Sequence, residues 1–151
     1  MKALIQAIQT ALKNAAGLAY ITDSNIFITA DENLLPVTAG FPAIGLKDGP
    51  VNVLIEDGAD WERTLSVDII IYQLLTAGDT SVMGQVDPKI YGVLEISEDI
   101  HAVLYDNKLS IAAIEAALPV NESASEIMGA DDMMLVTRKL TYKYRKLEVN
   151  P

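Results

Sequence analysis

The single histidine of this chain is the first side chain to consider for chemistry. His101 is followed by Asp106 and preceded by Glu98, so a general base or a metal ligand could be imagined from an imidazole beside carboxylates. Metal sites need several ligands at a recognisable spacing, and one imidazole with scattered carboxylates does not supply it. We therefore interpret His101 as a structural residue and predict no metal site.

Motifs for nucleophilic catalysis and phosphate binding are missing from the sequence. The chain has no cysteine, which excludes a thiol nucleophile, a thiolate zinc site and a disulfide framework. Neither the Gly-x-x-x-x-Gly-Lys-Ser/Thr loop nor the Gly-x-Gly-x-x-Gly loop occurs. In a chain this acidic, neighbouring carboxylates are most simply a solvated face. We expect no enzymatic activity and no cofactor.

The charge of the chain is unevenly distributed. The formal net charge is −10, which argues against a broad surface for gripping nucleic acid. Five of the 11 basic residues nevertheless lie within residues 138–146: Arg138, Lys139, Lys143, Arg145 and Lys146. This basic segment could be a plain solvated face, a contact with an acidic neighbouring copy, or a site for an anionic partner.

Two segments have the period of an amphipathic helix. The first carries one apolar stripe: Leu4, Ile5, Ile8, Leu12 and Ala15. The second is predicted to begin with Asp87 as N-cap and Pro88 at the first helical position, because proline lacks the amide that would have no partner there, and to end near Asp106-Asn107. Its apolar stripe is Val93, Ile96, Ile100 and Val103, and its opposite side carries Glu95, Glu98 and Asp99.

Three strands with turn residues between them are predicted in the middle of the chain. They span Phe41 to Lys47, Val51 to Glu56 and Trp61 to Leu75, with Asp48-Gly49-Pro50 and Asp57-Gly58 between them. Asp-Gly between apolar runs is typical of a β-hairpin, because both central positions of a type I′ turn need a positive φ. These segments predict a three-stranded meander. Trp61, beside the second turn, could pack at the start of its strand or anchor an interface.

The clearest strand is the last one, Met133 to Lys146. One face is mainly apolar, with Met134, Val136, Leu140, Tyr142 and Tyr144, and the other carries most of the basic side chains. Upstream, Tyr20 to Thr29 predicts an extended segment with a kink. Together the patterns predict a single α+β domain over residues 1–151, with a mainly antiparallel sheet of four or five strands and two helices packed on one face.

Three other segments are less regular. Residues 76–86 are predicted to form a polar loop, whose apolar pair Val82 and Met83 could dock on a neighbour or tuck beneath the loop. Residues 110–118 fit either a short helix or a strand. Residues 121–132 are acidic and polar and predict a surface loop. No run of about 18 apolar residues occurs, so we expect no association with a membrane.

The order of these parts resembles one known family. The N-terminal helix is followed by a Phe-Pro-Ala-Ile strand, a Thr-Leu-Ser-Val-Asp-Ile-Ile-Ile-Tyr strand, a Gly-Val-Leu-Glu-Ile-Ser-Glu-Asp-Ile-His-Ala-Val-Leu helix and a final Arg-Lys-Leu-Thr-Tyr-Lys-Tyr-Arg strand. Together they resemble the tail terminator, or tail completion, minor tail proteins of tailed bacteriophages and prophages. The likeness extends over nearly the whole chain and rests on patterns of apolar and polar positions.

The resemblance implies a structural protein of virion assembly. Such a protein forms a homohexameric ring on the finished tail tube, ends the polymerisation of the tube and provides the surface to which the head docks. Its implied partners are further copies of itself, the tail tube protein and the head–tail connector proteins. Its implied locations are the cytoplasm of the bacterial host during assembly and then the virion tail. The alternative is a small intracellular binding or adaptor domain that takes an anionic ligand or acidic partner on residues 138–146.

Two hypotheses place residues in such a ring. In the first, an acidic lumen lets DNA pass without binding it specifically, and the lining residues are Glu56, Asp57, Asp60 and Glu62. In the second, Lys139, Lys143 and Arg145 contact the acidic helix face of a neighbouring copy. Val82, Met83 and Trp61 are further candidates for the interface between copies.

Overall fold

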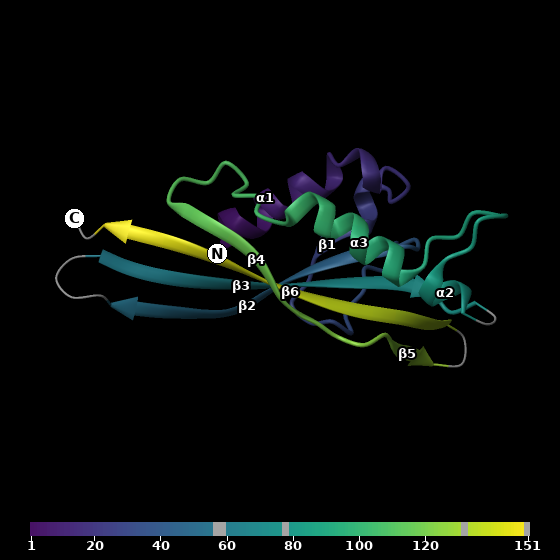
Figure 1. The fold of residues 1–151 in the computed structure, drawn as a ribbon. Helices are drawn as coiled ribbons and strands as arrows, with labels where there is room; N and C mark the ends of the chain where they lie inside the picture. The colour runs from purple at the N-terminus through teal and green to yellow at the C-terminus, as the bar shows by residue number, and fades with distance from the viewer. Residues whose placement is uncertain (56–59, 77–78, 131–132, 150–151) are drawn as a thin grey trace.

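A computed structural model shows a two-layer α+β fold, in which helices cover one face of a sheet of long strands (Figure 1). It describes residues 1–55, 60–76, 79–130 and 133–149, apart from the side chains of Asp60, Ala130 and Val149. The α-helices are α1 (Lys2–Lys13), α2 (Thr80–Met83) and α3 (Val93–Leu104), and two 3-10 turns are η1 (Ala16–Leu18) and η2 (Asp23–Asn25). None of the described helices is both long and apolar enough to cross a lipid bilayer.

The described strands form one mixed sheet. They are β1 (Ile26–Ile28), β2 (Ala43–Ile55), β3 (Asp60–Leu74), β4 (Ile114–Glu122), β5 (Glu126–Ala130) and β6 (Met133–Val149). Their order is β1-β2-β3-β6-β4, and β5 pairs with β6 further along the β4 side. Only the β1–β2 pair is parallel among these strands. The α+β class and the mainly antiparallel sheet agree with the prediction, whereas six strands and a short third helix exceed it.

The main core lies between the helices and the sheet. Helix α1 buries Leu4, Ile5, Ile8 and Leu12, and α3 buries Val93, Ile96, Ile100 and Leu104. They pack against alternate residues of the sheet, including Leu46, Val67, Ile69, Leu140 and Tyr142. Full burial of a Val, Leu or Ile side chain contributes about 1.5–3 kcal/mol, so these two stripes account for much of the driving force for folding. Both long helices therefore lie on one face of the sheet, as predicted.

A smaller core lies on the opposite face of the sheet. It consists of Phe27, Ala43, Ile70, Tyr72 and Leu135, with Leu35, Phe41 and Met128 packed against it. The segment between β1 and β2 covers this face, and the Tyr72 hydroxyl donates to the Glu32 carbonyl oxygen at 2.8 Å. This second core explains why the strands carry apolar residues on the side that faces away from the helices.

Helix α3 begins at Val93, and the predicted start at Asp87-Pro88 is wrong. Gln85 and Ile90 exchange two backbone hydrogen bonds of 2.8 and 2.9 Å, which place Asp87-Pro88 in a turn. The Asp87-Pro88 peptide bond is cis. Gly92 is the N-cap, and its N–H donates to Glu95 Oε2 at 3.2 Å. Asp-Pro is common in turns as well as at helix starts, and here the turn is the structure that forms.

Strand β2 continues through Asp48-Gly49-Pro50, so the predicted first hairpin is wrong. The pairing with β3 shifts register between Asp48 and Val51, which is a bulge rather than a turn. A Cβ atom on Gly49 would lie 2.9 Å from Cβ of Ser66, so glycine is needed here for close approach of the two strands. The middle of the chain is therefore one long hairpin. Asp57-Gly58 lies between its paired strands, outside the described residues.

The chain between α3 and β6 forms the far edge of the sheet. Residues 110–113 are turns and a strand starts at Ile114, which decides between the two alternatives for residues 110–118. The surface loop predicted for residues 121–132 is wrong, because it contains the end of β4 and all of β5. Strand β6 has 17 residues, and β4 and β5 together pair with most of its length. The kinked segment predicted at Tyr20 to Thr29 forms η2 and β1.

Candidate functional site

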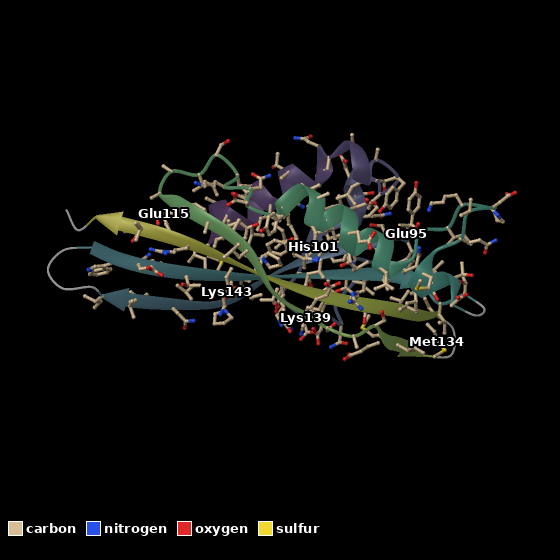
Figure 2. All side chains as sticks on the ribbon, viewed as in Figure 1. Glu95, His101, Glu115, Met134, Lys139 and Lys143 are labelled. Atoms are coloured by element: carbon tan, nitrogen blue, oxygen red, sulfur yellow. The ribbon has the colours of Figure 1, made fainter. Side chains whose placement is uncertain are left out.

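The predicted basic surface on β6 faces away from the helices. Lys139, Lys143 and Arg145 alternate with the buried residues Leu140, Tyr142 and Tyr144, as the period of the strand predicts. Figure 2 shows Lys139 and Lys143 on this strand, with Glu115 on the neighbouring strand β4. The strand thus separates a packed apolar face from a charged face.

Most of these basic side chains already have acidic partners in the same chain. Lys139 Nζ lies 3.3 Å from Glu32 Oε2, and Arg145 Nε lies 3.0 Å from Glu62 Oε2. Arg145 also approaches Glu115, at 3.7 Å between Nη2 and Oε2. Among the described residues, Lys143 makes no ion pair. Contact of these residues with a neighbouring copy stays a prediction, and it would have to compete with the internal pairs.

The predicted acidic face of α3 is also partly engaged within the chain. Glu95 accepts a 2.7 Å hydrogen bond from Lys89 Nζ, and this bond with that from Gly92 N–H holds the pKa of Glu95 below its usual range. Asp99 accepts the hydroxyl hydrogen bond of Tyr20 at 2.8 Å. Burial, together with that bond to Asp99, raises the pKa of Tyr20. Of the three acidic residues predicted for this face, Glu95 and Asp99 are half-buried and Glu98 is exposed to solvent.

A polar cluster joins α3, β4 and β6. Glu122 accepts hydrogen bonds from Ser97 Oγ at 2.6 Å and from Arg138 Nε at 2.7 Å, and His101 Nε2 lies 3.4 Å from it. The second ring nitrogen of His101 lies 2.5 Å from the Tyr142 hydroxyl. Partial burial alone would raise the pKa of Glu122, but the hydrogen bonds from Ser97, Arg138 and His101 outweigh burial and lower it.

The partners of His101 in this cluster are Glu122 and Tyr142, and they differ from Glu98 and Asp106, which the sequence places nearby. The structural role of His101 stays a prediction. The hydrogen bonds of the cluster tie the end of β4 to the helix layer. No group of three or more His, Asp or Glu side chains in the described part of the chain is arranged to hold a metal ion. The cluster could not be found from the sequence, because 21 residues separate His101 from Glu122 and 41 separate it from Tyr142.

The remaining predicted residues lie in separate places. Val82 is partly buried and packs against the main core, whereas Met83 is 57% exposed. Trp61 is 37% exposed near the free end of β3, with the Arg63 guanidinium 6.0 Å from its ring centroid. Of the predicted lumen acids, Glu62 is paired with Arg145. Glu56, Asp57 and the Asp60 side chain lie outside the described residues.

A feature that the sequence analysis missed is an apolar arm. The ends of β2, β3 and β6 project beyond the helix layer (Figure 1). Four residues of β2 in this arm are 45–73% exposed: Val51, Val53, Leu54 and Ile55. The sequence predicted the middle strand of a three-stranded meander at this place. The exposure of its side chains follows from the tertiary structure, because the strand continues past the residues with which β1 pairs and past the helix layer.

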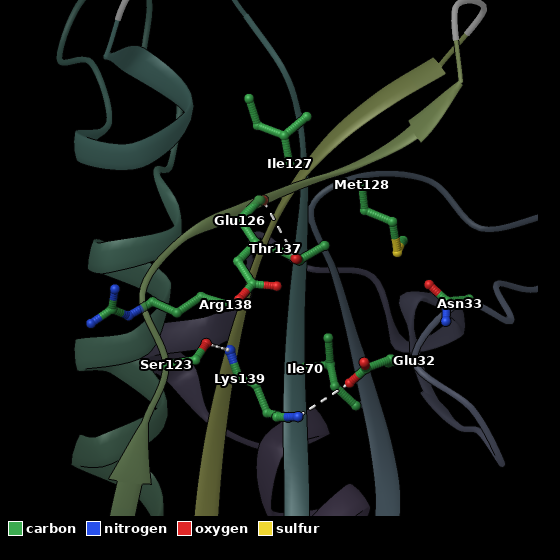
Figure 3. A pocket seen from close by; sticks show the side chains of 10 residues that line it. All are labelled: Glu32, Asn33, Ile70, Ser123, Glu126, Ile127, Met128, Thr137, Arg138 and Lys139. Atoms are coloured by element: carbon green, nitrogen blue, oxygen red, sulfur yellow. Dashed lines mark hydrogen bonds and ion pairs between the residues drawn. The ribbon is translucent and has the colours of Figure 1, made fainter.

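A cavity of about 250 Å³ lies on the face of the sheet opposite the helices, between β5, β6 and the segment after β1 (Figure 3). The Lys139–Glu32 ion pair crosses it, and Ser123 Oγ accepts the Lys139 backbone N–H at 3.0 Å. The Ser123 hydroxyl in turn donates to the Ala124 carbonyl oxygen. The two basic residues of the cavity lining are both paired with carboxylates, Lys139 with Glu32 and Arg138 with Glu122, which leaves an anionic ligand no unpaired cation to bind.

Comparisons with known proteins are informative about the fold of this chain. No protein-family model and no curated protein matches this sequence. Among solved structures, one chain of a structure described as "Virion of native gene transfer agent (GTA) particle" has the same fold, with a TM-score of 0.62. The alignment covers 96% of this chain and 95% of that chain at 11% sequence identity. At that identity the likeness shows a shared fold over the whole length of both chains.

Proposed function

We propose that this chain is a structural component of a phage-like particle, and that it acts as a tail terminator. In this role several copies form a ring on the end of the tail tube, end its polymerisation and present the surface to which the head docks. The observation that carries the proposal is the whole-length fold likeness to a chain of a gene transfer agent virion. The order of helices and strands, which resembles tail terminators, supports the finer assignment.

The surfaces of the molecule fit an assembly role. A long sheet with an exposed apolar arm gives a subunit extended contact surfaces, and large exposed apolar areas mark sites of protein contact. The alternative role, a binding domain for an anionic ligand, receives less support. Lys139 and Arg145, which would hold that ligand, are paired with Glu32 and Glu62.

The acidic lumen is part of the proposal. A net charge of −10 would keep a ring from holding the phosphates of DNA that passes through it. If Glu56, Asp57, Asp60 and Glu62 line that lumen, replacing all four with lysine should impair DNA passage and infectivity of assembled particles. Full infectivity of particles that contain the quadruple variant would rule this out.

Deletion of the gene in a particle-producing strain tests the proposed role. A tail terminator sets where the tube ends, so its loss should give tails of irregular and excessive length that carry no heads. Expression of the chain from a plasmid should restore uniform length. Headed particles with tails of normal length in the deletion strain would contradict the proposal, and particles that lack tails altogether would assign the chain an earlier step.

A further inference from the structure

We propose that the outer edge of β2 at Val51–Ile55 binds a second copy of this chain, which adds the same five residues as an antiparallel strand about a two-fold axis at Val53. This contact goes beyond the proposed ring, because a two-fold contact closes on itself as a dimer and cannot build a ring. It follows from the edges of the sheet and does not depend on the capping role.

The outer edge of β2 is covered only near its start. Strand β1 pairs with Ile44–Leu46, and the N–H of Thr29 adds one bond to the Leu46 carbonyl oxygen at 2.9 Å. No described residue pairs with the outer edge from Val51 to Ile55. The backbone groups that point outward there can accept another strand, which is the usual hazard of a free edge.

The five residues lack the features that normally protect a free edge. Such edges carry charged side chains, prolines or bulges. Residues 51–55 read Val-Asn-Val-Leu-Ile, without charge or proline, although 21% of the chain is charged. The bulge of β2 lies before Val51 and leaves the segment regular. Short segments with high β-propensity, no charge and no proline tend to pair with strands of other molecules.

The other side of the sheet offers no matching edge at this level. The Ala117 carbonyl oxygen of β4 accepts the Asp106 N–H at 3.0 Å, and Pro119 has no N–H to donate. Strand β4 also shifts register twice against β6. Two outer strands remain. Strand β1 has three residues and pairs with the start of β2, away from the arm. Strand β5 pairs with the first residues of β6, at the opposite end of the sheet from the arm. Among the described edges of the sheet, the edge at residues 51–55 is therefore best paired with the same edge of a second copy.

The two-fold arrangement makes the apolar face of the arm continuous. Val51, Val53 and Ile55 share one face of the strand, and Ile55 pairs with Trp61 on β3. Antiparallel pairing centred on Val53 places Val51 opposite the partner's Ile55 and Val53 opposite the partner's Val53. Arg63 lies opposite Val53 on β3 and forms an ion pair of 3.3 Å with Glu148, which also pairs with Lys146. The charge of Arg63 is therefore partly balanced within its own chain.

Cysteine cross-linking of the isolated chain tests this contact directly, because the chain contains no cysteine of its own. In the Val53→Cys variant, the two thiols meet across the axis, where directly opposite Cα atoms lie within the range of a disulfide. Oxidised glutathione should therefore convert this variant to a disulfide-linked dimer. Val120→Cys is the matched control. The Val120 side chain is 47% exposed, against 50% for Val53, and it lies on β4, on the other edge of the sheet. Equal cross-linking of both variants would overturn the proposal.

A second variant measures the dimer without cross-linking. Sedimentation should show unmodified protein at twice the chain mass of 16.3 kDa at high concentration. Val53→Lys should raise the dimer Kd by about tenfold or more, since like charges directly opposite each other destabilise a strand pair. Circular dichroism checks that the variant is folded. A wild-type chain that stays monomeric at every concentration, or an unchanged Kd in folded Val53→Lys, would overturn the proposal. Neither result would bear on tail capping.

Discussion

Glu122 lies at the end of β4, and its carboxylate contacts residues of both α3 and β6. The carboxylate accepts hydrogen bonds from Ser97 of α3 and Arg138 of β6, and His101, one turn further along α3, lies 3.4 Å from it. A carboxylate that accepts several hydrogen bonds is stabilised in its charged form. The negative charge at this site therefore holds the end of β4 against the helix layer.

Replacing Glu122 with glutamine should lower the free energy of unfolding by about 1 kcal/mol. Hydrogen bonds to charged groups contribute about 1.5–3 kcal/mol, and the partial exposure of this site to solvent reduces the effect. Urea denaturation measures the change. Glu115→Gln is the matched control, because its contact with Arg145 is long and exposed, and it should change stability by less than about 0.5 kcal/mol. Equal effects of the two variants would show that the Glu122 cluster adds no specific stability.

The contribution of Glu122 should also depend on pH. Its pKa in the fold lies below the ordinary value of 4.5, so the ionised form stabilises the fold fully above pH 4.5. This contribution is lost as the pH falls through the lower folded value. The stability difference between wild type and Glu122→Gln should therefore be constant from about pH 7 to pH 5 and shrink below pH 4.5. A difference that grows on acidification would contradict the assigned hydrogen bonds.

At the scale of elements, the long β2–β3 hairpin determines how the arm projects. The bulge at Asp48 to Val51 lets β2 continue along β3 where the sequence indicates a turn. Gly49 is required at this bulge because the strands approach so closely that a Cβ atom would contact both Cβ and the carbonyl oxygen of Ser66. The glycine provides space here and does not need a positive φ.

Gly49→Ala should destabilise the fold by about 1–3 kcal/mol, since the added methyl group forces β2 and β3 apart. Thermal unfolding followed by circular dichroism measures the loss. Gly17→Ala is the control, because a Cβ atom at Gly17 meets no atom within 4 Å. If Gly49→Ala unfolds at the same temperature as Gly17→Ala, then the two strands are not in close contact at the bulge.

A charged side chain at Ile100 of helix α3 should strongly destabilise the fold. The Ile100 side chain is 0% exposed in the main core, so Ile100→Asp buries an unpaired carboxyl group and should cost more than about 4 kcal/mol. Soluble yield and urea denaturation report the effect. Glu98→Asp introduces the same residue at an exposed site of the same helix and should cost only about 0.5 kcal/mol. A soluble Ile100→Asp protein with wild-type stability would show that α3 does not pack as described.

The apolar periods of the helices and strands could be predicted from the sequence, whereas turns and long-range contacts could not. The apolar stripes of α1 and α3 and the alternation along β6 were predicted, because a packed core imposes those periods. Two predictions from turn motifs were wrong, because such motifs report only local preference. Asp48-Gly49 lies in a strand because β2 continues its pairing with β3, and Asp87-Pro88 lies in a turn closed by the Gln85–Ile90 bridge rather than at a helix start. The ion pairs of Lys139 and Arg145 join distant parts of the chain, which no spacing along the sequence reveals.

At the scale of the whole molecule, one face of the sheet carries the helices, and its β2–β3–β6 end extends past them (Figure 1). The chain shares this fold along nearly its entire length with a chain of a gene transfer agent virion. The apolar arm and the charged face of β6 lie outside the main core. They are the surfaces on which the proposed assembly depends.

Cryo-electron microscopy of tailed particles from the producing strain tests the proposed capping role most directly. The proposal predicts that this fold fits the density of a single ring of six copies, located between the last ring of the tail tube and the head–tail connector. Tails that lack this ring should be of irregular length. Density for the fold repeated along the tube, or located only at the end of the tail distant from the head, would contradict the proposed role.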